Sequence, residues 1–188
     1  LTLAMPSDVD DEVLSWIADG TPPIYFGFGD TPVTSPAETV AVISAACAQI
    51  GERALICSGP NDFTRIAPAD HVRIVETVNH AAVFPTCRAI VHHGGAGTTA
   101  AGMRAGVPML ILWLWLDQPI WADAVSKLEI GVGRAFSAST LDSLVADLRW
   151  VRSAHFLSRA REVATQMTKP AESVAAVADL LEGVACRT

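Results

Sequence analysis

The chain has 188 residues and a formal net charge of −7; apolar residues make up 51% of it and charged residues 18%. This length and composition are typical of a compact domain with a substantial hydrophobic core. The negative charge argues against nucleic acid as a partner, because nucleic-acid binding needs clustered Lys and Arg.

The cysteines and the longest apolar run indicate the compartment in which the protein works. The four cysteines are scattered without a C-x-x-C pair, so we expect reduced core thiols of a cytoplasmic protein rather than disulfides. The longest apolar run, Val107 to Leu116, has about half the length of a membrane span. We therefore expect no integral membrane segment.

Residues 1–20 predict a linker and a short helix. The chain begins at Leu1 without an initiator Met or a signal peptide. Met5-Pro6-Ser7 and the acidic residues that follow are typical of an interdomain linker, which leads into a helix around Trp16. The remaining residues, 21–188, are predicted to form one Rossmann-like domain.

This domain is predicted to alternate strands and helices. The helix at 36–50 places Val40, Ile43 and Ala46 on one apolar face. The expected strands are 24–28, 53–57, 72–75, 89–91, 109–116 and 131–136. The other expected helices are 81–85, one that ends at Ala105, 121–128, 140–148, 154–167 and 171–181. The alternation implies an α/β fold with a parallel sheet, right-handed crossovers and helices on both faces.

The most informative segment, His92-His93-Gly94-Gly95-Ala96-Gly97-Thr98-Thr99, joins the strand at 89–91 to a helix. Glycines let the backbone approach an anion closely, and the first amides of a helix have no intrahelical partner. The hydroxyls of Thr98 and Thr99 and the imidazole of His93 would add side-chain donors. The segment predicts a diphosphate site; a glycine-rich turn with two histidines at a strand end is the alternative.

A second polar corner follows the next strand. Gly106-Val107-Pro108 ends the preceding helix, and the apolar stretch 109–116 ends at Asp117-Gln118-Pro119. Ligands of open α/β sheets bind outside the carboxyl ends of the strands. Asp accepts hydrogen bonds and Gln both donates and accepts them, as vicinal sugar hydroxyls require. Together the two corners predict a nucleotide-sugar site.

Histidines and tryptophans near these corners are assigned structural roles. We expect no metal site, because the adjacent His92 and His93 point to opposite faces of a strand and no H-x-x-x-H or cysteine pair supports one. His92 is expected to bond to a backbone carbonyl. Trp113, Trp115 and Trp121 are expected to lie mostly in the core, although one near Asp117 could flank a sugar.

The sequence resembles the donor domain of family 1 glycosyltransferases. This domain forms one half of a GT-B fold. The resemblance is closest to the bacterial branch that acts on antibiotic aglycones, sterols and mycobacterial glycolipids. It covers nearly the whole chain and rests on several motifs in order: Gly27-Phe28-Gly29, Val78 to Phe84, His93 to Thr99, Gly106-Val107-Pro108, Asp117-Gln118-Pro119 and Gly131-Val132-Gly133.

The resemblance implies roles for individual residues. His93 would contact the α-phosphate of the donor, and Asp117 and Gln118 would bind the transferred sugar. Thr77 and Val78 would hold the nucleobase, although the family often has an aromatic or apolar residue at the position of Thr77. The diphosphate would be bound by the residues of the glycine corner: His93, Gly94, Gly95, Gly97, Thr98 and Thr99.

The resemblance also implies a partner domain and a reaction. Family members have two Rossmann-like domains, and the general base comes from the amino-terminal, acceptor-binding domain. We therefore expect an excised carboxy-terminal half that binds a UDP- or dTDP-sugar without cofactor or metal and catalyses little alone. The whole protein would be an inverting hexosyltransferase for a hydroxyl of a lipid or natural product, peripheral to the membrane if the acceptor is a lipid.

One departure from the family lies next to the expected pyrophosphate. The family usually has Ser or Thr after Gly-Phe-Gly, whereas this chain has Asp30 after Gly29. A carboxylate within about 4–6 Å of a diphosphate would repel it, so Asp30 turns away, pairs with a cation or weakens donor binding. Asp30-Thr31-Pro32 is also ordinary turn chemistry. A non-catalytic nucleotide-binding or scaffolding module and a sugar-nucleotide epimerase or phosphorylase are the alternative functions.

Overall fold

The computed structural model describes residues 8–33, 35–63 and 66–185. They form a six-stranded, all-parallel sheet with the strand order β3-β2-β1-β4-β5-β6. The strands are β1 (Ile24–Gly27), β2 (Ala54–Cys57), β3 (Val72–Val75), β4 (Ala89–His92), β5 (Met109–Trp113) and β6 (Gly131–Ala135). This confirms the expected α/β class and the parallel sheet.

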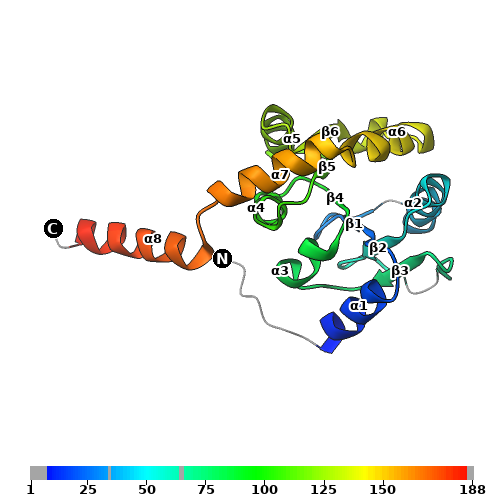
Figure 1. Cartoon of the computed structure of the whole chain (residues 1–188), viewed down its shortest axis with the longest axis horizontal. Coiled ribbons are helices and arrows are strands. Elements are labelled where there is room, and N and C mark those ends of the chain that lie inside the picture. Colours follow the sequence, from blue (N-terminus) through cyan, green and yellow to red (C-terminus); the bar gives the residue numbers. More distant parts are fainter. Residues whose placement is uncertain (1–7, 34, 64–65, 186–188) are drawn as a thin grey trace.

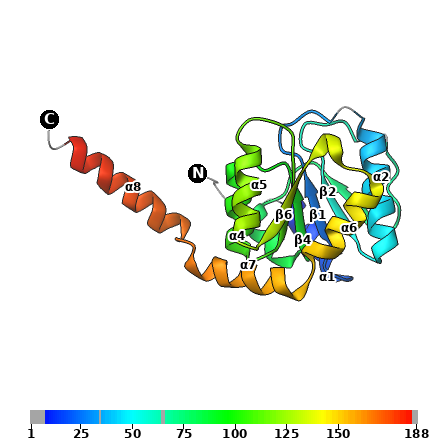
Figure 2. The ribbon, with the colours of Figure 1, turned by 90° about the horizontal axis from the view of Figure 1, so that it is seen from above.

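Helices cover both faces of the sheet, as Figures 1 and 2 show. In Figure 2, α2 and α6 lie on one face and α4 and α5 on the other. The helices are α1 (Asp8–Ala18), α2 (Pro36–Ile50), α3 (His80–Val83), α4 (Ala96–Ala105), α5 (Gln118–Lys127), α6 (Leu141–Val151), α7 (Ala154–Gln166) and α8 (Pro170–Ala185). Two short 3₁₀ turns, η1 (Phe84–Thr86) and η2 (Phe136–Ala138), complete the chain of elements.

The strand order reverses between β1 and β4. The chain adds β2 and β3 on one side of β1 and then returns to add β4, β5 and β6 on the other side. Gly27 at the end of β1 is in register with His92 at the end of β4. Such a reversal opens a crevice at the carboxyl ends of the strands, where ligands of open α/β sheets bind. The fold therefore brings Gly27 and His92 to the edge of that crevice.

Alternation along β1 divides the core into two clusters. Ile24, Phe26 and Phe28 pack in the cluster with α2 and α6, whereas Tyr25 packs in the other cluster with Leu55 of β2. All of these side chains are at most 3% exposed. Burial of a side chain as large as Phe26 stabilises the fold by about 1.5–3 kcal/mol. Each face of the sheet is thus anchored by its own apolar layer.

Helix α1 packs onto the domain rather than standing apart from it. Val13 is fully buried and Ile17 is 6% exposed. The Arg53 guanidinium lies 3.6 Å above the Trp16 ring and donates to the Trp16 and Ile17 carbonyls. The linker expected before this helix falls on residues 1–7, outside the described residues, so the boundary of 1–20 stays a prediction.

The largest difference from the expected elements lies between β5 and α5. The apolar stretch predicted one strand to Leu116, but β5 ends at Trp113 and α5 begins at Gln118 instead of Trp121. The Gln118 side-chain oxygen accepts from the Leu114 amide at 2.8 Å and the Trp115 amide at 3.2 Å, and these bonds close a turn. The expectation that Trp115 lies in the core is wrong, because it is 50% exposed.

The C-terminal helix α8 extends away from the rest of the domain in both ribbon views. It is longer than the expected 171–181 helix. Its exposed apolar side chains are Val174, Val177, Leu180 and Leu181. Within the described ranges, no helix combines the length and apolarity needed to cross a bilayer.

Candidate functional site

The turn between β4 and α4 requires glycine. Gly94 has φ +93°, and a Cβ there would lie 2.8 Å from Cγ2 of Ile111. Gly95 is the N-cap residue of α4 and supplies no side-chain acceptor for the amides at the start of the helix. The first helix amides are therefore left for an external acceptor, and the helix dipole favours an anion there.

His93 lies against this turn. A Cβ on Gly29 would lie 2.7 Å from Cε1 of His93, and a Cβ on Gly95 would lie 2.5 Å from its Nε2. Burial lowers the pKa of His93, while a hydrogen bond to the Gly27 backbone and the carboxylates of Asp30 and Asp117 oppose that shift. The ring is thus mainly neutral at pH 7, so toward a bound phosphate it would serve as a hydrogen-bond donor rather than as a fixed positive charge.

His92 is fully buried and faces the core. Its Nδ1 accepts a hydrogen bond from the Gly94 amide at 3.1 Å, so the ring proton resides on Nε2. The expected bond to a backbone carbonyl is wrong, because Nε2 has no hydrogen-bond partner in the part of the chain that the structure describes. The partner of Nδ1 is an amide, and this bond holds the sharp turn at Gly94. Burial, and to a smaller extent the charges of His93 and His80, lower the pKa of His92 to about 3.

The two threonines of the corner occupy different environments. Thr98 lines a cavity at the carboxyl edge of the sheet. Thr99 is 1% exposed, and its hydroxyl donates to the Gly95 carbonyl at 2.9 Å. The structure thus brings Thr98 to the cavity and directs Thr99 inward, where it braces the first turn of α4.

The cavity has a volume of about 210 Å³. Several residues expected at the donor site from distant parts of the sequence meet in its wall, namely Gly29, Asp30, Thr77, Val78 and Thr98. The grouping follows from the sheet: its parallel strands all end at one edge, and the reversal of strand order places β4 next to β1. Gly97 lies in the first turn of α4 and is not among the residues that line the cavity.

Sequence reasoning missed other residues of the cavity wall, among them Tyr25, Cys57, Glu76 and His80. The Tyr25 hydroxyl lies 3.3 Å from Nε2 of His80, whose ring stacks on Phe84 with centroids 4.3 Å apart. Burial raises the pKa of Tyr25 and lowers that of His80, so both are neutral hydrogen-bonding groups at pH 7. The period-2 alternation of β1 was the one signal that could have placed Tyr25 on this face.

The Asp117–Gln118 corner adjoins the glycine turn. A Cβ on Gly94 would lie 3.2 Å from Cβ of Gln118. The Gln118 oxygen is engaged in the turn before α5, which leaves its amide nitrogen as a donor. Asp117 is exposed, and its Oδ2 accepts from the Trp121 indole at 2.8 Å. Gln118 is thus oriented by two hydrogen bonds and Asp117 by one, and each keeps polar atoms that could bind a ligand.

The charges around the cavity are unusual for an anion site. Asp30 and Glu76 line it, and no Lys or Arg does so among the described residues. In the same part of the chain, no group of three His, Cys, Asp or Glu side chains is placed to hold a metal ion. An anion bound here would therefore depend on helix amides, glycine backbone and neutral side-chain donors.

Comparison with known proteins gives a consistent result. Residues 35–181 match the family described as Erythromycin biosynthesis protein CIII-like, C-terminal domain. An uncharacterized glycosyltransferase of Mycobacterium tuberculosis is 63% identical over 187 residues, which are 100% of this chain and 45% of that protein. A sterol 3-beta-glucosyltransferase of Arabidopsis thaliana is 38% identical over 132 residues, covering 70% of this chain and 21% of that protein.

Solved structures agree with these relatives. The glycosyltransferase VinC in complex with dTDP superposes with a TM-score of 0.68 at 26% identity, covering 86% of this chain and 40% of that one. The spinosyn rhamnosyltransferase SpnG gives a TM-score of 0.71 at 23% identity, over 85% of this chain and 45% of that one. The chain thus spans less than half the length of these relatives. It belongs to the Erythromycin biosynthesis protein CIII-like C-terminal family, the nucleotide-sugar donor-binding halves of GT-B glycosyltransferases.

Proposed function

We propose that this domain binds a UDP- or dTDP-sugar in an inverting glycosyltransferase that transfers a hexose to a hydroxyl of a lipid or natural-product acceptor. One observation carries the proposal: three features meet at one edge of the sheet. They are the uncapped start of α4, the cavity lined by Thr77 and Val78, and the Asp117–Gln118 corner. The dTDP bound to VinC supports a nucleotide-linked donor, and the sterol named for the Arabidopsis relative supports a lipid acceptor.

The proposed chemistry is electrostatic on this side of the cleft. As the bond between the anomeric carbon and the diphosphate oxygen breaks, negative charge grows on the departing diphosphate. The amides of α4, the Thr98 hydroxyl and the neutral His93 ring stabilise that charge. Asp117 and Gln118 hold the sugar so that the acceptor oxygen attacks the opposite face of the anomeric carbon, and the acceptor proton passes to a base on the amino-terminal domain.

Calorimetric titration of the chain with UDP and with dTDP tests the proposal. Thr98→Ala removes a hydroxyl from the cavity wall, so we expect affinity for the preferred nucleotide to fall about tenfold, as for a lost hydrogen bond to a charged group. Thr165→Ala, at an exposed position of α7, removes a hydroxyl that donates to the Glu162 carbonyl far from the cavity wall and serves as the matched control. Absence of binding to either nucleotide, or equal affinities for Thr98→Ala and wild type, contradicts the proposal.

The acidic lining favours one alternative, a non-catalytic scaffolding module. Asp30 and Glu76 both border the cavity, and a pair of carboxylates would repel a diphosphate. A thermal-unfolding titration separates the two functions, because a ligand that binds the folded state raises the melting temperature by mass action. A donor domain responds to UDP or dTDP at millimolar concentration, whereas a scaffold does not.

A further inference from the structure

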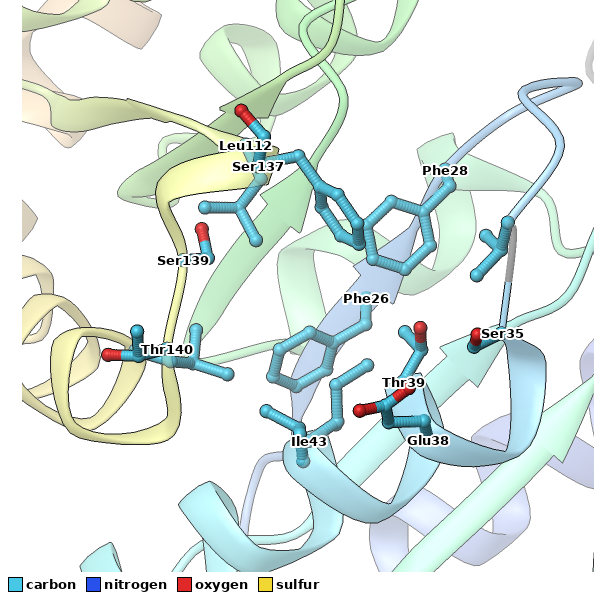
Figure 3. Close-up of a pocket in the computed structure, with 14 residues that line it drawn as sticks. Phe26, Phe28, Ser35, Glu38, Thr39, Ile43, Leu112, Ser137, Ser139 and Thr140 are labelled. Atoms are coloured by element: carbon cyan, nitrogen blue, oxygen red, sulfur yellow. The ribbon is translucent and has the colours of Figure 1, made fainter.

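A second cavity lies on the opposite face of the sheet, and the proposed function does not use it. Its volume is about 320 Å³, and it lies between β1, β5, α2, η2 and the start of α6. Figure 3 shows Phe26, Phe28, Ile43 and Leu112 around it, with Ser35, Glu38 and Thr39 on the side of α2. Phe28 follows the end of β1 and η2 follows the end of β6, so the cavity lies at the carboxyl edge of the sheet.

The walls of this cavity are mainly aromatic and aliphatic. Phe26 and Phe28 are at most 3% exposed and form part of the wall from β1. The Phe28 and Phe136 rings meet edge to face with centroids 5.5 Å apart, which fixes the orientation of both. Cavities from about 300 Å³ upward with mostly apolar walls and few polar groups are typical of small-molecule sites. The dimensions suit one or two fused rings.

One side chain gives the cavity its charge. Glu38 lies in the first turn of α2, and Figure 3 shows it extending from that helix toward the cavity. It forms no ion pair with any residue that the structure describes.

Two of the hydroxyls that line the cavity are engaged in hydrogen bonds. Ser139 donates to the Ala135 carbonyl, and Thr140 accepts from the Ser143 amide in the cap of α6. Glu38, an exposed residue, is the one ionisable group among the residues that line this cavity.

We propose that this apolar cavity binds a small ring compound that carries a positively charged nitrogen. The ring contacts Phe26, Phe28 and Phe136, and the ammonium group lies toward the Glu38 carboxylate. An ammonium also interacts favourably with the faces of aromatic rings, which line this cavity. A compound with a carboxylate at the same position is disfavoured by repulsion from Glu38. The proposed site is separate from the cavity lined by Thr77, Val78 and Thr98, called the donor cavity below. From β1, Tyr25 and Gly27 line the donor cavity, whereas Phe26 and Phe28 line the apolar one.

Three probes that share one ring and differ in the end group test the proposal. They are 2-naphthylmethylamine, 2-naphthalenemethanol and 2-naphthoate, each titrated against the chain and followed by NMR. We expect saturable binding of the amine, about threefold to tenfold weaker binding of the alcohol and still weaker binding of the carboxylate. Glu38→Gln removes the preference for the amine and leaves binding of the alcohol unchanged.

A cavity-filling pair locates the binding site. Thr39→Phe places a ring in the cavity, so we expect amine affinity to fall at least about tenfold. Ala41→Phe places the same ring on the exposed face of the same helix and leaves affinity unchanged. UDP and dTDP affinities stay at the wild-type value in all three variants, so failure here is distinguishable from failure of donor binding. No saturable amine binding, equal affinity for the three probes, or equal losses in Thr39→Phe and Ala41→Phe overturns the proposal.

Discussion

The two cavities at the carboxyl edge of the sheet share strand β1 and yet have opposite chemistry. Tyr25 and Gly27 face the donor cavity, whereas Phe26 and Phe28 face the apolar cavity. The period-2 alternation of a strand is enough to separate them. On one side, Gly27 has no side chain to fill the cavity; on the other, the rings of Phe26 and Phe28 form an apolar wall. One short strand thus divides the proposed donor-binding surface from an apolar surface that stabilises the fold.

The largest expected effect is a loss of stability from a substitution in the wall of the apolar cavity. Phe26→Ala removes a fully buried ring beside an existing cavity, so we expect the free energy of unfolding in urea to fall by about 3–5 kcal/mol. Nucleotide affinity of the folded protein stays within about twofold of wild type, because the ring faces away from the donor cavity. A large loss of UDP or dTDP affinity in calorimetry on the folded variant would show that the two sides are coupled.

The next effect is a pH dependence of the free energy of unfolding, which His92 at the end of β4 causes. The pKa of His92 is lowered to about 3 in the folded protein, against about 6.5 in an unfolded chain. Between these values the unfolded state binds the additional proton, so stability falls as pH decreases from about 6.5, by up to about 1.4 kcal/mol per pH unit. Urea unfolding from about pH 7 to about pH 4.5 measures this slope.

His92→Asn provides the comparison for that slope. Asn keeps an acceptor that can serve the Gly94 amide but does not titrate, so the variant loses the part of the slope that belongs to His92. His80 and His93, whose pKa values burial also lowers, contribute with the same sign and remain in the variant. Identical slopes for variant and wild type would rule out His92 as a source of the acid sensitivity.

A smaller effect separates the two threonines of the glycine corner. Thr99→Val keeps the volume and removes the hydroxyl that donates to the Gly95 carbonyl, so we expect a loss of about 1 kcal/mol in the free energy of unfolding. Nucleotide affinity, measured in the same titrations as for Thr98→Ala, stays unchanged. If Thr99→Val instead weakens binding as strongly as Thr98→Ala, both hydroxyls contact the ligand and the inward orientation of Thr99 does not persist in the complex.

The smallest effect concerns the carboxylate that borders the donor cavity. Asp30→Ser replaces a negative charge near the expected diphosphate with a hydroxyl, so we expect UDP or dTDP affinity to increase about twofold to fivefold at low ionic strength. Asp142→Asn removes an exposed charge in the first turn of α6 and controls for net charge. An increase of the same size in both variants would assign the effect to net charge rather than to the position of Asp30.

The sequence predicted the parts of the fold that depend on local chemistry. Glycine and proline at Gly106 and Pro108 correctly separate α4 from β5, and the apolar spacing of 36–50 gives α2 with the expected bounds. The residues after Trp113 could not be placed from the sequence. A run of apolar residues looks the same whether it is buried or exposed, and the Gln118 side chain, which bonds two amides, helps to turn the chain there.

The residues of the site could be predicted where one short motif contains them. They could not be predicted where segments distant in the sequence meet. The glycine corner and Asp117–Gln118 follow from the ends of single strands. Tyr25 and Glu76 meet Thr98 because the strand order places β4 next to β1, a property of the whole sheet. The opposite directions of Thr98 and Thr99 depend on the rotation of α4 against the sheet, which no short motif specifies.

The turn before α5 has a consequence for the entropy of ligand binding. Leu116 has φ 54° and is 84% exposed, a conformation that costs a residue other than glycine about 1–2 kcal/mol. The two hydrogen bonds that the Gln118 side chain accepts and the Trp121–Asp117 bond hold this turn in place. Because that ordering is completed when the chain folds, a ligand that reaches Asp117 meets a preorganised wall and loses little further chain freedom on arrival.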